Sequence, residues 1–259
     1  MHPADMLYTL SGFCVGALVG MTGVGGGSLM TPLLILLFGI HPSAAIGTDL
    51  LYASITKAGG AAIHGLNRTV DWLVVRRLAS GSVPASAVTL AILSHYDPAT
   101  APMQRFLSIA LGAALVITAL TVIFRPQIVA WFTRRVGEPP ARVVAMLTVA
   151  TGAILGVLVS LTSVGAGALG VTALVLVYPR LPTSRIIGSD IAHAVPLTLV
   201  AGIGHLLLSP IDFGVLGLLL LGSLPGIFVG SQLAVLVSDA ILRLALSSVL
   251  VIVGGRLLL

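Results

Sequence analysis

A succession of long apolar segments is the feature of this sequence that most restricts its fold. They lie at 6–38, 43–63, 73–94, 106–124, 143–178, 186–208, 213–237 and 240–259. Most are close to the roughly 20 residues that a helix needs to cross a bilayer. Only 8% of the residues are charged and 57% are hydrophobic, whereas a soluble domain is about 25% charged. We therefore predict an all-α, polytopic membrane protein.

The basic charge of the chain does not indicate nucleic-acid binding. The formal net charge is +5 and the pI is near 10.1, but the basic residues are a single lysine and arginines scattered along the chain. No basic run exists that could track a phosphate backbone. The charge is better explained by membrane topology, because cytoplasmic loops are rich in arginine. The expected surroundings are a lipid bilayer, with no nucleic-acid partner.

Two of the apolar segments are too long for one crossing. As single helices, 6–38 and 143–178 would reach about 50 Å, against about 30 Å of hydrocarbon. Each is interrupted near its middle by small residues, Thr22-Gly-Val-Gly-Gly-Gly27 in the first and Thr162-Ser-Val-Gly-Ala-Gly167 in the second. Glycine weakens a helix by about 1 kcal/mol per residue. We predict that each long segment is a pair of helices meeting at a Gly-rich break, and that each pair either crosses the membrane twice or forms a re-entrant hairpin.

The breaks also reveal an internal repeat. Thr22-Gly-Val-Gly25 matches Thr162-Ser-Val-Gly165 at an offset of 140, and the offset then becomes 141. The later matches pair rare polar residues: Gly47-Thr-Asp49 with Gly188-Ser-Asp190, His64 with His205, Asp71 with Asp212, and Gly81-Ser-Val-Pro84 with Gly222-Ser-Leu-Pro225. The sequence therefore predicts two homologous transmembrane halves, 1–124 and 143–259, joined by a cytoplasmic linker, 125–142.

The arginines favour an inverted relation between these halves. If each long segment crosses twice, each half has five crossings, and the second half is inverted relative to the first. With the linker cytoplasmic, ten arginines then lie inside, and only Arg105 and Arg256 lie outside. If each long segment crossed once, the halves would be parallel and the split would be eight to four. The positive-inside rule therefore favours two inverted five-segment repeats.

The two breaks are the strongest candidates for a binding site. Non-helical backbone survives inside a membrane only where it is buried in protein or lines a cavity, and a helix that starts there offers free N–H donors to an anion. Inverted repeats bring such breaks to the midplane. The candidate substrate-binding residues of the breaks are Thr22, Gly23, Gly25, Gly26, Gly27, Ser28, Thr162, Ser163, Gly165 and Gly167. The alternative is that these glycines only permit close helix packing, as we expect for Gly12, Gly16 and Gly20.

These motifs resemble the sulfite exporter TauE/SafE family. The resemblance rests on Gly23-Val-Gly-Gly-Gly27 with Pro32, its degenerate copy at 162–172, and Gly222-Ser-Leu-Pro-Gly226 with Gly230. It spans essentially the whole chain. It implies a bacterial inner-membrane permease for small sulfur-containing or organic anions, such as sulfite or sulfonates. The chain departs from the family pattern at Ala166, at Thr172 in place of a proline, and at Ala85 in place of a glycine.

Lys57 is the only lysine and falls within the 43–63 segment. A lysine in hydrocarbon costs about 2.5–3.5 kcal/mol on insertion scales and therefore marks function by default. We interpret it as a counter-charge for a substrate anion or as a salt-bridge partner. The alternative is that its side chain extends toward the membrane surface.

Two aspartates and three histidines are candidates for coupling or gating. Asp49 and Asp190 follow equivalent Gly-Thr and Gly-Ser pairs, and the alternative is that each caps the first turn of its helix. His193 lies three residues after Asp190 and could relay a proton, although Tyr52 stands at the equivalent place. His64 and His205 close the same two helices. Histidine titrates near neutral pH, but a histidine at a helix end is also commonly an interfacial residue.

Two prolines, Pro84 and Pro225, are expected to kink their helices. Ser82 and Ser223 lie two residues before them. Together these residues could widen the space for a substrate.

Three functional classes follow from these residues. The first is a secondary transporter, here an exporter, of small anions that works by alternating access around a midplane site. The second is an anion channel, and the third is an intramembrane enzyme, for which no nucleophile has a base nearby in sequence. We predict a transporter with no catalytic residues, no metal ligands and no cofactor. Its energy would come from an ion gradient, with proton or sodium as the coupling ion, or from the substrate gradient itself, and the sequence carries no signal for an oligomeric state.

Overall fold

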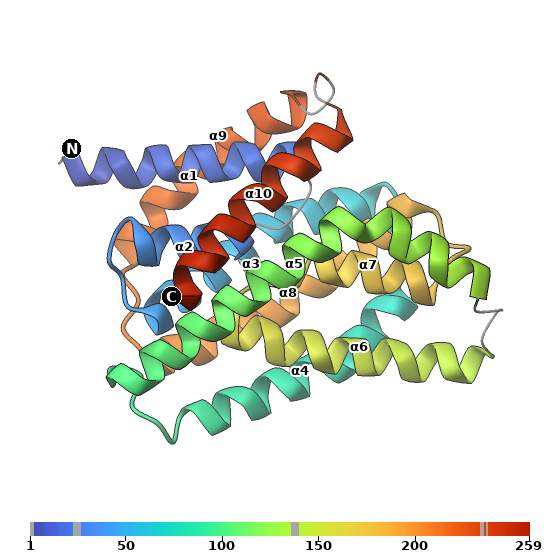
Figure 1. The fold of residues 1–259 in the computed structure, drawn as a ribbon, viewed down its shortest axis with the longest axis horizontal. Helices are drawn as coiled ribbons and strands as arrows, with labels where there is room; N and C mark the ends of the chain where they lie inside the picture. The colour runs from blue at the N-terminus through green and yellow to red at the C-terminus, as the bar shows by residue number, and fades with distance from the viewer. Residues whose placement is uncertain (1–2, 23–26, 136–139, 234–235, 237) are drawn as a thin grey trace.

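The computed structural model describes residues 3–22, 27–135, 140–233, 236 and 238–259, and the ten regular elements in these ranges are all α-helices (Figure 1). The first half contains α1 (Pro3–Thr22), α2 (Gly27–Leu36), α3 (Pro42–Leu66), α4 (Trp72–Leu93) and α5 (Ala101–Arg135). The second half contains α6 (Ala141–Thr162), α7 (Ala168–Val177), α8 (Thr183–Leu208), α9 (Phe213–Leu233) and α10 (Asp239–Leu258). The helix α5 therefore continues well into the predicted linker, 125–142.

The lengths and hydropathy of these helices confirm a polytopic membrane protein. Among the described residues, six helices are long and apolar enough to cross a bilayer, namely α1, α5, α6, α8, α9 and α10. The helices α3 and α4 have similar lengths of 25 and 22 residues but are not among these six. The prediction of an all-α, polytopic membrane fold is therefore correct.

Each over-long apolar segment is indeed a pair of helices. The first helix of each pair runs toward the middle of the molecule, and the second returns toward the side from which the first entered (Figure 1). The returning helices, α2 and α7, have 10 residues each. At about 1.5 Å per residue such a helix covers about 15 Å, half of the hydrocarbon thickness. The two crossings per long segment that we expected are therefore a hairpin with one short arm.

The two halves are interleaved rather than side by side. The helix α1 packs on α9 of the other half, and the equivalent helix α6 packs on α4. At the centre, α3 packs on α8, and α5 packs on α10 (Figure 1). Exchanging the halves leaves this set of contacts unchanged, as expected for an internal repeat. The inversion of the halves across a membrane stays a prediction.

Glycines allow the interleaved helices to approach closely. A Cβ atom at Gly12, Gly16 or Gly20 of α1 would collide with the backbone of α9. In return, Gly222, Gly226 and Gly230 of α9 pack directly on the backbone of α1. The packing role predicted for the glycines of α1 is therefore confirmed. Small residues at such interfaces favour association because they bring two backbones into van der Waals contact.

Candidate functional site

The candidate site is built on the central helices α3 and α8, which are antiparallel. A Cβ at Gly47, near the start of α3, would meet His205 near the end of α8, and a Cβ at Gly188 would meet Nδ1 of His64. The helices begin at Pro42 and Thr183, several residues before the two aspartates, and neither has an acidic residue in its first turn. The interpretation of Asp49 and Asp190 as first-turn caps is therefore wrong.

Three charged side chains instead lie along the interior of this helix pair. Asp49 and Asp190 are 0% and 1% exposed. In the antiparallel register, in which Gly47 faces His205, the two aspartates are separated by about 13 residues, or about 20 Å along the axis. Lys57 lies between them on α3 and interacts electrostatically with both carboxylates, more strongly with Asp190. The sequence indicated each residue separately but gave no sign that they share one axis.

The ammonium group of Lys57 points into the second break. Its Nζ donates a hydrogen bond to the carbonyl oxygen of Ala166 at 3.1 Å. This contact joins residues 109 positions apart in the chain. The side chain of Lys57 therefore does not extend to the membrane surface, which was the alternative interpretation.

The second break is a defined loop between α6 and α7. Ser163 follows α6 in the left-handed conformation, and Gly165 and Gly167 have φ angles of 127° and 124°. These φ values strain any residue with a side chain, so glycine is required at both positions. The hydroxyl of Thr162 donates to the carbonyl of Leu158 and accepts from the N–H of Val164, so it holds the loop in place. The hydroxyl of Ser163 is buried without a hydrogen-bond partner.

The first break falls largely outside the described residues, and this includes Gly23, Gly25 and Gly26. On its two sides, the hydroxyl of Thr22 donates to the carbonyl of Leu18, as Thr162 does in the other half, and Ser28 is buried in α2, which begins at Gly27.

Both carboxylates lie against the short helices that follow the breaks. The carboxylate of Asp190 interacts with the backbone N–H of Gly167, the residue that precedes α7. Its Oδ1 packs against Gly170, where a Cβ atom would collide with it. The protein's own carboxylate therefore already lies where we expected a substrate anion to meet the N-terminus of a half-helix.

The two equivalent aspartates differ in their hydrogen bonds. Oδ2 of Asp49 accepts from the hydroxyl of Thr31 on α2 at 2.5 Å. The equivalent threonine on α7, Thr172, donates instead to the carbonyl of Ala168, whereas Oδ1 is buried without a partner in both aspartates. The sequence analysis missed Thr31, although an offset of 141 pairs it with Thr172 and would have indicated it.

Polar side chains from α4 and α9 lie near the two aspartates. Nε2 of His193 is 2.8 Å from the hydroxyl of Ser82, whereas its Nδ1 is buried without a partner. At the equivalent place in the other half, the hydroxyls of Tyr52 and Ser223 are both buried without a hydrogen-bond partner. His193 also interacts electrostatically with Lys57. A relay between Asp190 and His193 stays a prediction.

The other two histidines lie at the far ends of the central helices. Nε2 of His205 is 2.7 Å from the carbonyl oxygen of Ser160, and Nδ1 is 3.4 Å from the hydroxyl of Ser43. Nδ1 of His64 is 2.8 Å from the hydroxyl of Thr69. His205 is only 1% exposed, so it is a buried link between helices rather than an interfacial residue.

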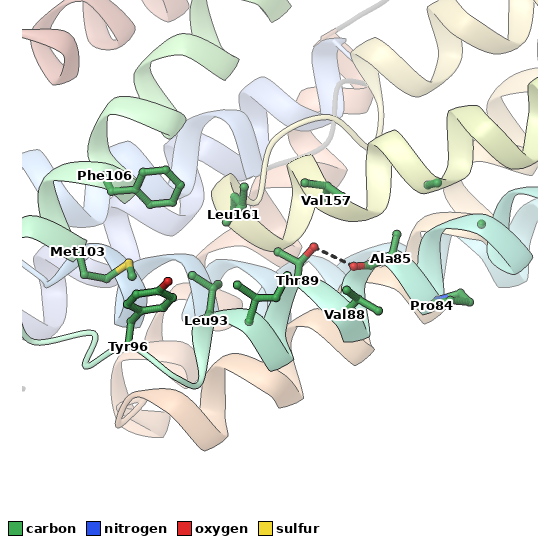
Figure 2. A pocket seen from close by; sticks show the side chains of 13 residues that line it. Pro84, Ala85, Val88, Thr89, Leu93, Tyr96, Met103, Phe106, Val157 and Leu161 are labelled. Carbon is green, nitrogen blue, oxygen red and sulfur yellow. Dashed lines mark hydrogen bonds between the residues drawn. The ribbon is translucent and has the colours of Figure 1, made fainter.

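Two cavities of different character lie near this site. A cavity of about 840 Å³ between α4, α5 and α6 has an apolar lining that includes Pro84, Val88, Tyr96 and Phe106, and none of its lining residues is charged (Figure 2). It suits hydrocarbon rather than an anion. Ser82 is not among its lining residues. The expectation that Pro84 and Ser82 together widen one substrate space therefore finds no support there.

A second cavity, of about 140 Å³, is lined in part by polar and charged residues and adjoins the second break. Its lining includes Gly167, Thr172 and Asp190, together with two arginines from α5 and α10, Arg125 and Arg243. In the sequence these arginines serve only as topology signals, because nothing local distinguishes them from the other arginines.

Comparisons with known proteins agree with the geometry of a membrane protein. The model of the family described as "Sulfite exporter TauE/SafE" matches residues 8–257. Among the curated proteins of Bacillus subtilis (strain 168), the "Probable membrane transporter protein YjnA" is 38% identical over 255 residues, which cover 96% of this chain and 98% of that protein. The "Probable membrane transporter protein YdhB" is 26% identical over 98% of this chain and 100% of its own length. No solved structure matches the chain.

Proposed function

The chain belongs to the sulfite exporter TauE/SafE family, and from this membership we propose that it is a secondary transporter of small anions such as sulfite or sulfonates. Its family and its relatives make it a membrane transporter rather than an enzyme. The substrate class, the export direction, the bacterial inner membrane as its location and the alternating-access mechanism are parts of the proposal.

The observation that carries the proposal is the contact between Lys57 and the second break. An isolated ammonium group in the membrane interior is costly, and such groups commonly mark a substrate pathway. Here Nζ of Lys57 lies at a non-helical loop, which is where free backbone donors are available to an anion. Ser163 adds a buried hydroxyl at the same loop, which lies near the carboxylate of Asp49 but makes no hydrogen bond. These groups can bind the oxygens of a small oxyanion.

The charges around Lys57 favour the proton as the coupling ion. Lys57 carries one positive charge, whereas Asp49 and Asp190 together carry two negative charges when both are ionised. A substrate anion entering this site would then meet net repulsion. A proton on one carboxylate removes that repulsion, so the anion and the proton would bind together. Sodium is the alternative coupling ion, since carboxylate oxygens also bind hard cations.

The interleaved hairpins support alternating access. Each half contributes one hairpin, made of a long and a short helix, and three further long helices, and the hairpins enter from opposite ends of the molecule (Figure 1). Such an arrangement is typical of inverted repeats with half-helices near the midplane. In the proposed mechanism, the two halves rock around the site at Lys57 and expose it to one side at a time.

Counterflow in proteoliposomes tests the proposal. The purified protein is reconstituted into liposomes preloaded with unlabelled sulfite or methanesulfonate, and uptake of the labelled anion is followed with and without a pH gradient. We expect saturable uptake that is accelerated by unlabelled anion on the far side and that responds to the pH gradient.

Three other outcomes would change the proposal. Conductance without counterflow would favour the anion channel. Counterflow that depends on sodium and not on pH would replace the coupling ion. No flux of either anion, from protein shown to be folded, would overturn the proposed substrate class.

A further inference from the structure

The small cavity beside the second break combines apolar lining residues with three charged side chains, those of Arg125, Asp190 and Arg243. Its volume is about 140 Å³, enough for several waters or one small oxyanion and below the range of larger organic ligands. Five helices meet there. Thr22 comes from α1, Arg125 from α5, Asp190 from α8 and Arg243 from α10, and Gly167 precedes α7.

The two arginines are arranged to receive an anion. Arg125 is half-buried and lies close enough to Arg243 for their positive charges to repel. Within the described part of the chain, neither guanidinium group has a carboxylate partner. Two cations that face one cavity and form no ion pair with a carboxylate repel each other, and an anion bound between them would remove that repulsion. Guanidinium groups match the oxygens of a sulfonate or sulfite particularly well, because they can donate two parallel hydrogen bonds.

The inner end of the cavity is formed by Asp190. Its side chain is 99% buried, and Oδ1 has no hydrogen-bond partner. The equivalent Asp49 is also buried with an unpartnered Oδ1, but its Oδ2 accepts a hydrogen bond from Thr31 and it does not line this cavity. The cavity therefore combines two arginines, the start of a half-helix, and one carboxyl group that is free to give or accept a proton.

We propose that this cavity, which we name the arginine cavity, is an anion site where a small oxyanion binds only when Asp190 carries a proton. The proposal rests on the function proposed above and adds its ligands. Arg125 and Arg243 bind the anion from the open side, the N–H of Gly167 donates to it, and the protonated carboxyl of Asp190 donates its own hydrogen bond. When Asp190 is ionised, its charge repels the anion and interacts with Lys57 instead.

Few other charged or titratable groups lie close enough to Asp190 to affect its ionisation. Lys57 faces it from α3, and His193 lies three residues away on its own helix. From α4, Arg76 is exposed and Arg77 donates to the hydroxyl of Tyr178. Arg142, on α6, is exposed at the end of that helix. The pH dependence expected of the site is therefore that of Asp190, modulated by Lys57 and His193.

The test measures equilibrium binding of methanesulfonate to the purified full-length protein by calorimetry between pH 5 and 8. Methanesulfonate keeps a single negative charge across this range, so any pH dependence belongs to the protein. We expect the double variant Arg125→Gln with Arg243→Gln to bind at least about tenfold more weakly than the wild type. The matched control is Arg105→Gln with Arg256→Gln, which removes one arginine from the opposite end of each of the same two helices. This control should bind as the wild type does.

Asp190 provides the second arm of the test. Wild-type affinity should fall as the pH rises, because the carboxyl loses its proton and becomes negative. Asp190→Asn keeps a hydrogen-bond donor and cannot ionise, so its affinity should stay near the low-pH wild-type value at every pH. Equal binding by the two double variants, or an unchanged pH dependence in Asp190→Asn, would overturn the proposal.

Binding and transport separate this proposal from the proposed function. Counterflow that survives the loss of Arg125 and Arg243 would remove the arginine cavity and leave the transporter in place. Methanesulfonate binding with the expected pH dependence, but without counterflow, would support the arginine cavity and overturn the proposed transport function.

Discussion

Lys57 connects the two halves of the protein through a single side chain. It extends from α3 of the first half to the carbonyl of Ala166 in the break of the second half, and it lies in the field of Asp190 and Asp49. Its repeat-equivalent residue, Thr198, donates only within its own helix, to Ala194. The repeat therefore accounts for the helical scaffold. The positive charge comes from a lysine that has no counterpart in the second half.

Replacing Lys57 with methionine should remove transport and leave the protein folded. Methionine has a similar length and no charge, and the two buried carboxylates can take up protons once the ammonium group is gone. We expect anion counterflow to fall at least about tenfold, since a hydrogen bond to a charged group is worth about 1.5–3 kcal/mol. Thr198→Val, at the equivalent position, should retain wild-type flux. Unchanged flux in Lys57→Met would remove Lys57 from the substrate site.

Gly170 should matter because it makes room for a carboxylate. A Cβ at this position would collide with Oδ1 of Asp190, so Gly170→Ala should displace the carboxyl from the start of α7. We expect at least about a tenfold loss of flux, in line with the sensitivity of positioned groups to small displacements, and a shifted pH profile of flux. The matched control is Gly59→Ala on α3, where a Cβ meets nothing within 4 Å. A wild-type pH profile in Gly170→Ala would contradict the placement of Asp190.

At the scale of elements, the helices of the two halves are joined by backbone contact. The α1–α9 interface has glycines on both sides, and the equivalent α4–α6 interface has Gly81 on one side with Gly152 and Gly156 on the other. The second interface uses other small residues where the first has glycine, including Ser160, whose hydroxyl is 2.7 Å from that of Ser86. The helices therefore approach closely at both interfaces. Glycine permits this at the α1–α9 interface, and glycine together with a serine–serine hydrogen bond does so at the α4–α6 interface.

A large side chain in the α1–α9 interface should destabilise the protein. Gly226 packs on the backbone of Phe13, so Gly226→Leu must separate the two helices. Overpacking costs about 1–3 kcal/mol or more, which corresponds to a melting temperature lower by about 3–10 °C. Thermal unfolding of the detergent-solubilised protein measures it. Gly217→Leu, on the same helix but facing open space, should melt within a degree or two of the wild type. Equal melting temperatures for the two variants would show that the interface tolerates separation.

At the scale of the whole molecule, the interleaving of the halves determines what can move. The hairpin of each half is fixed to a long helix of the other half, α1 to α9 and α6 to α4. The central pair, α3 and α8, carries the charged residues between these two units. A rocking motion would therefore displace each hairpin together with the α4 or α9 helix on which it packs, while the charged residues stay near the axis.

Equivalent loops should open to opposite sides of the membrane. Asn67, after α3, and Ser209, after α8, occupy nearly equivalent positions in the two halves. In a background lacking the exposed Cys14, we introduce Asn67→Cys or Ser209→Cys and treat intact cells with a membrane-impermeant maleimide. Because Arg68 favours the cytoplasmic side for the first loop, Ser209→Cys should be labelled and Asn67→Cys protected until the cells are permeabilised. Labelling of both, or protection of both, would contradict inverted halves.

Local properties of the sequence determined the class of fold and its repeat. Hydropathy and helix propensity depend on neighbouring residues, so the apolar segments, the two Gly-rich breaks and the packing glycines of α1 could all be predicted from the chain alone. The family followed from the same motifs. The sequence also identified Lys57, Asp49 and Asp190 as unusual, because charges are rare in segments destined for hydrocarbon.

Only the tertiary structure decided how these parts meet. The short returning helices α2 and α7, the antiparallel register of α3 and α8, and the contact of Lys57 with Ala166 depend on distances between residues far apart in the chain. The same is true of the pairing of Arg125 with Arg243 and of the different hydrogen bonds of two equivalent aspartates. Such distances are fixed by backbones in contact at glycines and by where each helix ends. A periodicity along one segment carries no information about either the partner of a buried charge or the space beside it.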